Sequence, residues 1–139
     1  MDRRWKIVLG AMVWAVGTAQ AEEIPFLGRV APIVVERCLS CHNPKKAMGN
    51  YRVDTWARMM ADSRAGPMIE PGRPDDSLFL MLIESNEPNG RMPKGKKPLP
   101  AAEIAILRRW IEEGARGEGI DPDSELAGLV ARAKAARPR

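Results

Sequence analysis

The stretch Cys38-Leu39-Ser40-Cys41-His42 decides the fold of this chain. Two cysteines three positions apart, with a histidine directly after the second, form the signature at which a c-type haem is attached. On a helical turn these three side chains share one face, so both thiols can form thioethers with the haem vinyl groups while the imidazole reaches the iron. The motif therefore predicts one covalently attached haem c, held by Cys38 and Cys41, with His42 as an iron ligand.

Other uses of two cysteines and a histidine fit the sequence less well. The chain contains two cysteines and one histidine in all, so a tetrahedral zinc site would lack its fourth nitrogen or sulfur ligand. A thioredoxin-like redox pair would lie in a βαβ unit, which the surrounding sequence does not provide. A plain disulfide between Cys38 and Cys41 remains open as an alternative in an exported protein.

Residues 1–21 have the features of a signal peptide. Three basic residues among the first six precede an apolar run, and the segment ends in the small-x-small pattern Ala19-Gln20-Ala21. The apolar run is shorter than the roughly 20 residues that cross a bilayer, and no later segment is a candidate span. We therefore expect a mature periplasmic chain that starts at Glu22 and has no membrane span; an uncleaved anchor is the alternative.

The charge of the chain gives no reason to expect a nucleic-acid partner. The formal net charge is +4 for the whole sequence. Removal of residues 1–21 takes away three basic residues and one acidic residue, which leaves about +2, and ionised haem propionates would lower it further. No pattern of basic and stacking aromatic residues is present either. We therefore expect protein partners and no nucleic acid.

Helical periodicity recurs along the chain, and no segment has a convincing strand pattern. Apolar residues between Phe26 and Cys41 repeat at helical spacing, so the haem motif is expected to close a first helix that Asn43-Pro44 terminates. Further helical segments are expected at residues 56–61, 78–83, 101–113 and, after a Gly/Pro linker, 124–136. These patterns predict an all-α fold.

A six-coordinate haem needs a second axial ligand, and with a single histidine the natural candidate is a methionine. Met92 stands in a polar loop before a proline, and Met68 in a Gly/Pro-rich loop is its main rival. Met48 lies too near the histidine in sequence to reach the opposite haem face easily. The other three have the helical spacing of core-filling methionines: Met59, Met60 and Met81. The residues alone leave Met92 and Met68 open.

A series of motifs follows the haem-attachment sequence in a fixed order. They are Gly66-Pro67, Glu70 to Pro74, Ser77-Leu78, Arg91-Met92-Pro93, Ala102-Glu103-Ile104, Arg108 to Ile111 and Gly114-Ala115. Over about residues 30 to 115 the chain resembles the planctomycete-type cytochrome c domain, a relative of the class I c-type cytochromes. The resemblance implies a small cytochrome c-like haem fold with crossing first and last helices, His42 as proximal ligand and Met92 as distal ligand.

On this resemblance, residues 22–116 form a cytochrome c domain, and residues 117–139 form a linker and C-terminal tail without a family counterpart. Ligation by histidine and methionine fills both axial positions, which favours outer-sphere transfer of single electrons between periplasmic partners. We expect no enzymatic activity, because no distal proton-transfer group is apparent. The alternative is a haem subunit of a larger respiratory or dehydrogenase complex; a haem enzyme or sensor is a weaker one.

Basic side chains surround Met92 in the sequence. Beside Arg91 stand three lysines that we call the lysine rim: Lys94, Lys96 and Lys97. If Met92 binds iron, the lysine rim borders the haem pocket and would steer an acidic redox partner toward it. A solvated basic loop without a docking role is the plain alternative.

Two further contacts to the haem region are expected. The indole N–H groups of Trp56 and Trp110 are candidates to bond haem propionates, although a helical tryptophan more often fills the core. The second ring nitrogen of His42 is expected to donate to a backbone carbonyl in the loop 43–49, which would fix the ring.

Overall fold

The computed structural model describes residues 22–136, and the expected signal peptide, residues 1–21, lies outside that range. The helices are η1 (Phe26–Val30), α1 (Ala31–Arg37), η2 (Met48–Asn50), α2 (Trp56–Met60), η3 (Pro74–Asp76), α3 (Leu78–Glu84), α4 (Ala101–Glu112) and α5 (Leu126–Ala135). Between residues 22 and 136 the chain forms no strand, so the predicted all-α fold is confirmed. None of the described helices has the length and apolarity that a membrane crossing requires.

The first helix ends earlier than its sequence pattern predicts. The π-helical turn η1 passes directly into α1, which ends at Arg37 rather than at Cys41. The haem motif then forms a separate turn, in which the backbone N–H groups of Cys41 and His42 both donate to the carbonyl of Cys38 at 3.1 Å. The motif thus lies just beyond the helix, with its three functional side chains gathered on a tight turn.

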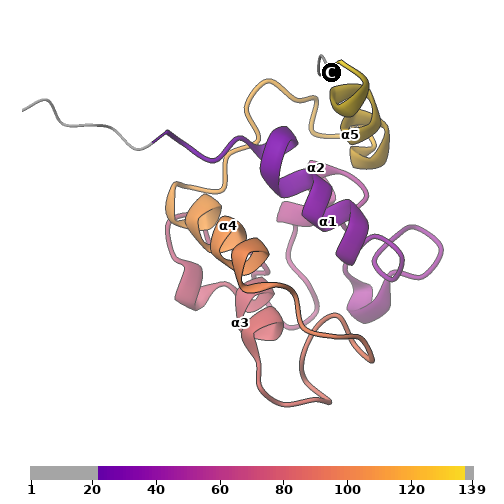
Figure 1. Cartoon of the computed structure of the whole chain (residues 1–139). Coiled ribbons are helices and arrows are strands. Elements are labelled where there is room, and N and C mark those ends of the chain that lie inside the picture. The colour runs from indigo at the N-terminus through magenta and orange to yellow at the C-terminus, as the bar shows by residue number, and fades with distance from the viewer. Residues whose placement is uncertain (1–21, 137–139) are drawn as a thin grey trace, which may run out of the picture.

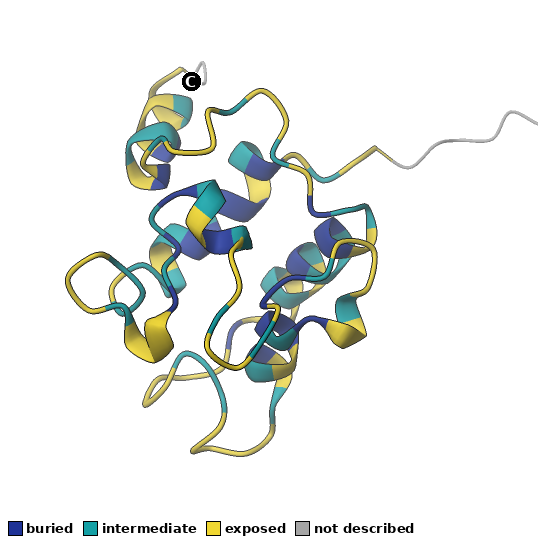
Figure 2. Cartoon of the chain, turned by 180° about the vertical axis from the view of Figure 1, so that it is seen from behind, coloured by how far each residue is buried: buried dark blue, intermediate teal, exposed yellow. Residues whose placement is uncertain are grey.

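The first helical segment packs against both of the last two helices. It contacts α4 through η1, where the rings of Phe26 and Trp110 lie 5.5 Å apart, and it contacts α5 through η1 and α1. Each of these helices carries buried residues, and much of the loop chain is exposed (Figure 2). The predicted contact between the first and last helices is therefore present.

Residues 117–136 fold back onto the domain (Figure 1). The N–H of Leu126 donates to the carbonyl of Asp54 at 2.8 Å, and the N–H of Ala57 donates to the carbonyl of Pro122 at 2.9 Å. Leu126 and Val130 on α5 are buried in the common core. The segment that sequence reasoning left without a role is thus an integral layer of the described fold.

The Gly/Pro-rich loop before α3 is ordered by a buried serine. The hydroxyl of Ser77, fully buried, accepts from the N–H of Glu70 at 2.9 Å and donates to the carbonyl of Arg73 at 3.0 Å. The N–H of Gly72 donates to the carbonyl of Ile111 at 2.7 Å, which fastens this loop to α4. The loop therefore holds α3 in place as one wall of the cavity described next.

Candidate functional site

A cavity of about 580 Å³ opens between the first helix, α3 and the loop that precedes α4. Its volume lies within the range of about 300 to 1,000 Å³ that is usual for pockets holding small molecules and cofactors. Most of its lining is apolar and comes from Val53, Met68, Leu78, Phe79, Leu82, Ile83 and Leu99. A large, flat, apolar group suits such a lining, because each apolar surface that it covers is removed from water.

All four site residues predicted from the sequence line this one cavity: Cys38, Cys41, His42 and Met92. Two of the other methionines, Met48 and Met68, line it as well. Met59, Met60 and Met81 do not line it. Met59 is fully buried and Met60 packs against the core, as expected of core-filling side chains, whereas Met81 is 55% exposed, so the prediction of a core role for Met81 is wrong. Sulfur-bearing side chains therefore line the cavity from four places: the haem motif, η2, the loop before α3 and the loop before α4.

No disulfide joins Cys38 and Cys41, both of which lie within the described residues. Burial raises the pKa of the Cys38 thiol to about 12, and the neighbouring Cys41 adds to this shift, while the charge of Arg37 opposes it. At neutral pH the Cys38 side chain is consequently a protonated thiol that faces an apolar cavity.

One ring nitrogen of His42 is fixed by the backbone. Its Nδ1 lies 3.1 Å from the carbonyl oxygen of Tyr51. Because a carbonyl only accepts hydrogen bonds, this contact places the ring proton on Nδ1 and leaves the lone pair on Nε2. The N–H of Val53 also donates to the carbonyl of His42 at 2.9 Å. The imidazole thus has one nitrogen available to a metal and a fixed orientation.

The bonded carbonyl is not in the loop 43–49, where the sequence analysis expected it. That loop closes on itself, because the side-chain oxygen of Asn43 accepts from the N–H groups of Lys45 and Lys46. Left-handed backbone conformations at Ala47, Gly49 and Asn50 then reverse the chain. The segment that returns past His42 is therefore residues 51–53, and Tyr51 supplies the carbonyl.

The two tryptophans do not serve the cavity. The indole N–H of Trp110 donates to the carbonyl of Arg116 at 2.9 Å, so the hypothesis that it bonds a propionate is wrong. Trp56 does not line the cavity and packs against Gly117 instead. Trp110 is a core residue and Trp56 is a partly buried residue packed against the core, so the general tendency of helical tryptophans to pack in the interior predicts both better than the functional hypothesis.

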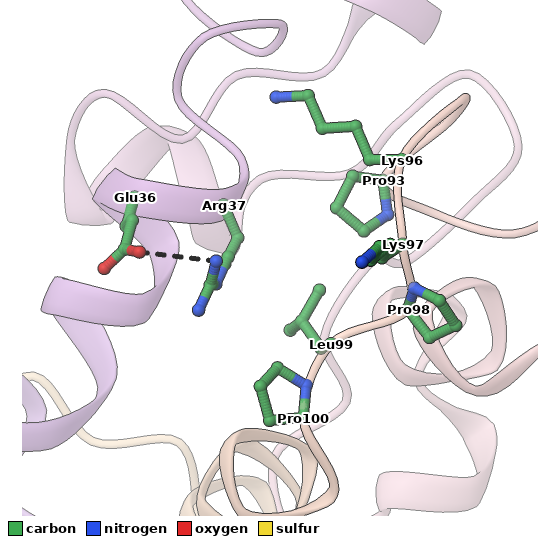
Figure 3. Close-up of a pocket in the computed structure, with 8 residues that line it drawn as sticks. All are labelled: Glu36, Arg37, Pro93, Lys96, Lys97, Pro98, Leu99 and Pro100. Carbon is green, nitrogen blue, oxygen red and sulfur yellow. Dashed lines mark ion pairs between the residues drawn. The ribbon is translucent and has the colours of Figure 1, made fainter.

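A second cavity, of about 310 Å³, adjoins the first (Figure 3). Glu36 and Arg37 at the end of α1 form one side, and the loop from Pro93 to Pro100 forms the other (Figure 3). Arg37, Pro93, Lys96 and Leu99 line both cavities. Lys94 and Lys96 line the larger cavity and Lys97 lines the smaller one, all three being exposed, so the lysine rim borders the site.

Residues 38–95 match the model of a protein family described as Planctomycete cytochrome C. The resemblance inferred from the ordered motifs is confirmed over this stretch, which runs from the haem-attachment motif to the loop of Met92. Cytochromes c bind haem and are typically electron carriers rather than enzymes. Searches among curated proteins and among solved structures gave no match to the chain.

Proposed function

Because residues 38–95 match the Planctomycete cytochrome C family, we propose that this chain is a monohaem c-type cytochrome that carries single electrons between periplasmic redox partners. The observation that carries the proposal is the shared cavity. Two free thiols, a histidine with an available Nε2 and a loop methionine meet at its lining.

The residues around the cavity fit a covalently held haem. The thiols of Cys38 and Cys41 would each add across a vinyl group, which forms a carbon–sulfur bond and leaves no separate product. His42 would bind the iron through Nε2, with its other nitrogen held by the Tyr51 carbonyl. When bound, the group supplies a one-electron iron couple, and a methionine thioether favours its ferrous form.

Met92 is the distal ligand in this proposal. Its backbone is anchored because its N–H donates to the carbonyl of Leu82 on α3 at 2.9 Å. Met68 is buried in the cavity wall, where an unbranched thioether also serves as an ordinary core side chain. With both axial positions filled, electrons would pass through the haem edge without bond making at the iron.

The lysine rim is the proposed docking surface for an acidic redox partner. Its three exposed ammonium groups lie on the loop that borders the cavity, and no ion pair joins any of them to another residue within 22–136. Such charges raise the rate of encounter with an oppositely charged protein without requiring tight binding.

The proposal is tested on protein isolated from the periplasm. Absorption spectra of the oxidised and reduced forms should be those of a low-spin, six-coordinate c-type haem, and acid-acetone treatment should leave the haem on the polypeptide. The double variant Cys38→Ala, Cys41→Ala is the control and should yield a chain without haem. If acid-acetone removed all haem from the unmodified protein, covalent attachment would be ruled out.

A further inference from the structure

The first helical segment and α4 run antiparallel and are joined differently at their two ends. At one end Phe26 packs against Trp110, near the end of α4. At the other end the side chain of Arg37 reaches Glu103, in the first turn of α4. The smaller cavity lies beside this second junction, where Leu99 is the one buried apolar residue in the lining. The ion pair therefore joins the two helices at the end that borders the smaller cavity.

The contact between Arg37 and Glu103 is a two-pronged ion pair. Nε of the arginine donates to Oε2 of Glu103 at 2.9 Å, and Nη2 donates to Oε1 at 2.7 Å. A weaker third contact joins Nη1 to Glu36 at 3.3 Å. The arginine and Glu103 side chains are 34% and 23% exposed, so both are partly shielded from water. Bidentate geometry with partial shielding is the form of ion pair that resists opening best.

The ion pair connects the two sides of the proposed iron site. Arg37 directly precedes Cys38, on the side of the cavity that carries His42. Glu103 lies three residues after Pro100, where the loop that carries Met92 enters α4. That loop is anchored at one end by the bond between Met92 N–H and the Leu82 carbonyl. At its other end it enters α4, which Glu103 ties to Arg37 and Arg108 ties to Glu84 and Asp75. Loss of the Arg37–Glu103 pair would leave the Met92 anchor and the Arg108 ion pairs in place and would release the start of α4 from the side of the cavity that carries His42.

We propose that Arg37 and Glu103 form a clasp that positions the Met92 loop and sets how often the distal iron position opens. This inference rests on the proposed function, because it assumes that Met92 is the distal ligand. An added ligand binds the iron only in the open form, so its apparent affinity is proportional to the fraction of molecules that are open. Weakening the clasp should therefore tighten the binding of such a ligand.

The test is a spectroscopic titration of the ferric holoprotein with imidazole. In Glu103→Gln, which keeps the size of the side chain and removes its charge, imidazole should bind about tenfold more tightly than to the unmodified protein, equivalent to about 1.4 kcal/mol. Arg37→Gln should give a similar factor. The double variant should add little beyond either single one, because both substitutions break the same pair.

Glu113→Gln is the matched control. Glu113 is 24% exposed, accepts from Arg109 Nε at 2.7 Å and from the N–H of Ile24 at 2.7 Å, and lies at the other end of α4. It lines neither cavity. We expect Glu113→Gln to lower the thermal unfolding temperature about as much as Glu103→Gln does, with imidazole affinity changed less than twofold.

Equal imidazole affinities in Glu103→Gln and Glu113→Gln, whether raised or unchanged, would overturn the clasp. So would additive effects of Arg37→Gln and Glu103→Gln. The ligation on which the clasp depends is checked separately by Met92→Ala, which should abolish the near-red charge-transfer band of the ferric protein. A band that survives in Met92→Ala would overturn both the ligation and the clasp. If the band is lost in Met92→Ala but imidazole binds Glu103→Gln no more tightly than it binds the unmodified protein, the clasp alone would be overturned.

Discussion

Gly117→Ala is predicted to destabilise the protein, because the position lies against the indole of Trp56. A Cβ atom built at residue 117 would lie 2.7 Å from both Cδ1 and Cε2 of that ring, closer than real Cβ contacts. The indole is a rigid bicyclic group, and its nitrogen is already buried with no hydrogen-bond partner among residues 22–136. Relief therefore requires either a movement of the ring or a movement of the backbone that leads into α5.

Two opposing effects set how much Gly117→Ala lowers the free energy of unfolding. Overpacking of this kind costs about 1 to 3 kcal/mol. Replacing a glycine whose backbone an alanine can adopt returns about 0.4 to 1 kcal/mol, because the unfolded chain loses freedom. Because the indole is rigid and the contacts are this short, the cost falls in the upper part of its range, about 2 to 3 kcal/mol, and the net loss is roughly 1 to 2 kcal/mol. At an unfolding entropy of about 2.1 cal/mol/K per residue, a domain the size of residues 22–136 should lose about 4 to 8 °C in unfolding temperature.

The assay is thermal and urea unfolding of the holoprotein, with Gly90→Ala as the control. Atoms near a Cβ at Gly90 lie 3.6 Å or more away, so that substitution should change stability by less than about 0.5 kcal/mol. The haem absorption spectrum should be unchanged in Gly117→Ala, since neither Gly117 nor Trp56 lines the cavity. The loss of stability caused by Gly117→Ala should also disappear when Trp56 is replaced by leucine. An unchanged unfolding temperature, or the same loss in the Trp56→Leu variant, would refute the steric argument.

Four further outcomes are expected. Gly128→Ala, inside α5 with its nearest neighbour atom 3.4 Å away, should raise stability by about 0.5 to 1 kcal/mol, read as a higher urea midpoint. Met92→Ala should remove the near-red band of the ferric spectrum and Met68→Ala should retain it; the reverse would transfer the ligand role to Met68. Reversing the charges of the lysine rim should slow electron transfer to an acidic partner in stopped flow, most strongly at low salt, without changing the spectrum; a rate indifferent to both salt and charge would leave the rim as a solvated loop. The intact mass of the native protein should correspond to a chain that begins at Glu22 and carries one haem, and retention of residues 1–21 would contradict cleavage.

The sequence predicted the type and position of most helices. Local periodicity and turn residues determine such elements, so α2, α3 and α4 lie close to the segments expected at 56–61, 78–83 and 101–113. The end of the first helix was placed too late at Cys41, because apolar spacing continues across the haem motif after the α-helical hydrogen bonds have stopped. Hydrophobic periodicity predicts which side chains face the interior, but it does not predict the residue at which the helix ends.

The parts that sequence reasoning missed depend on contacts between distant segments. The partner of the Trp110 indole is a backbone carbonyl at Arg116, and the packing of Trp56 on Gly117 is set by how the chain after α4 turns back. No local pattern signals either contact. The ion pair between Arg37 and Glu103 spans 66 residues, and both residues resemble ordinary charged positions on exposed helix faces.

The attachment of the His42 residue at two points affects how the site would respond to a change of iron charge. Its ring nitrogen meets the Tyr51 carbonyl and its own carbonyl meets the Val53 N–H, and between these partners Arg52 is paired with Asp54 at 2.7 and 2.8 Å. A ligand fastened at both its ring and its backbone shifts little when the metal gains or loses an electron. In the proposed electron carrier, the nuclear rearrangement that accompanies each transfer would therefore be small, and exchange would remain fast even when donor and acceptor differ little in potential.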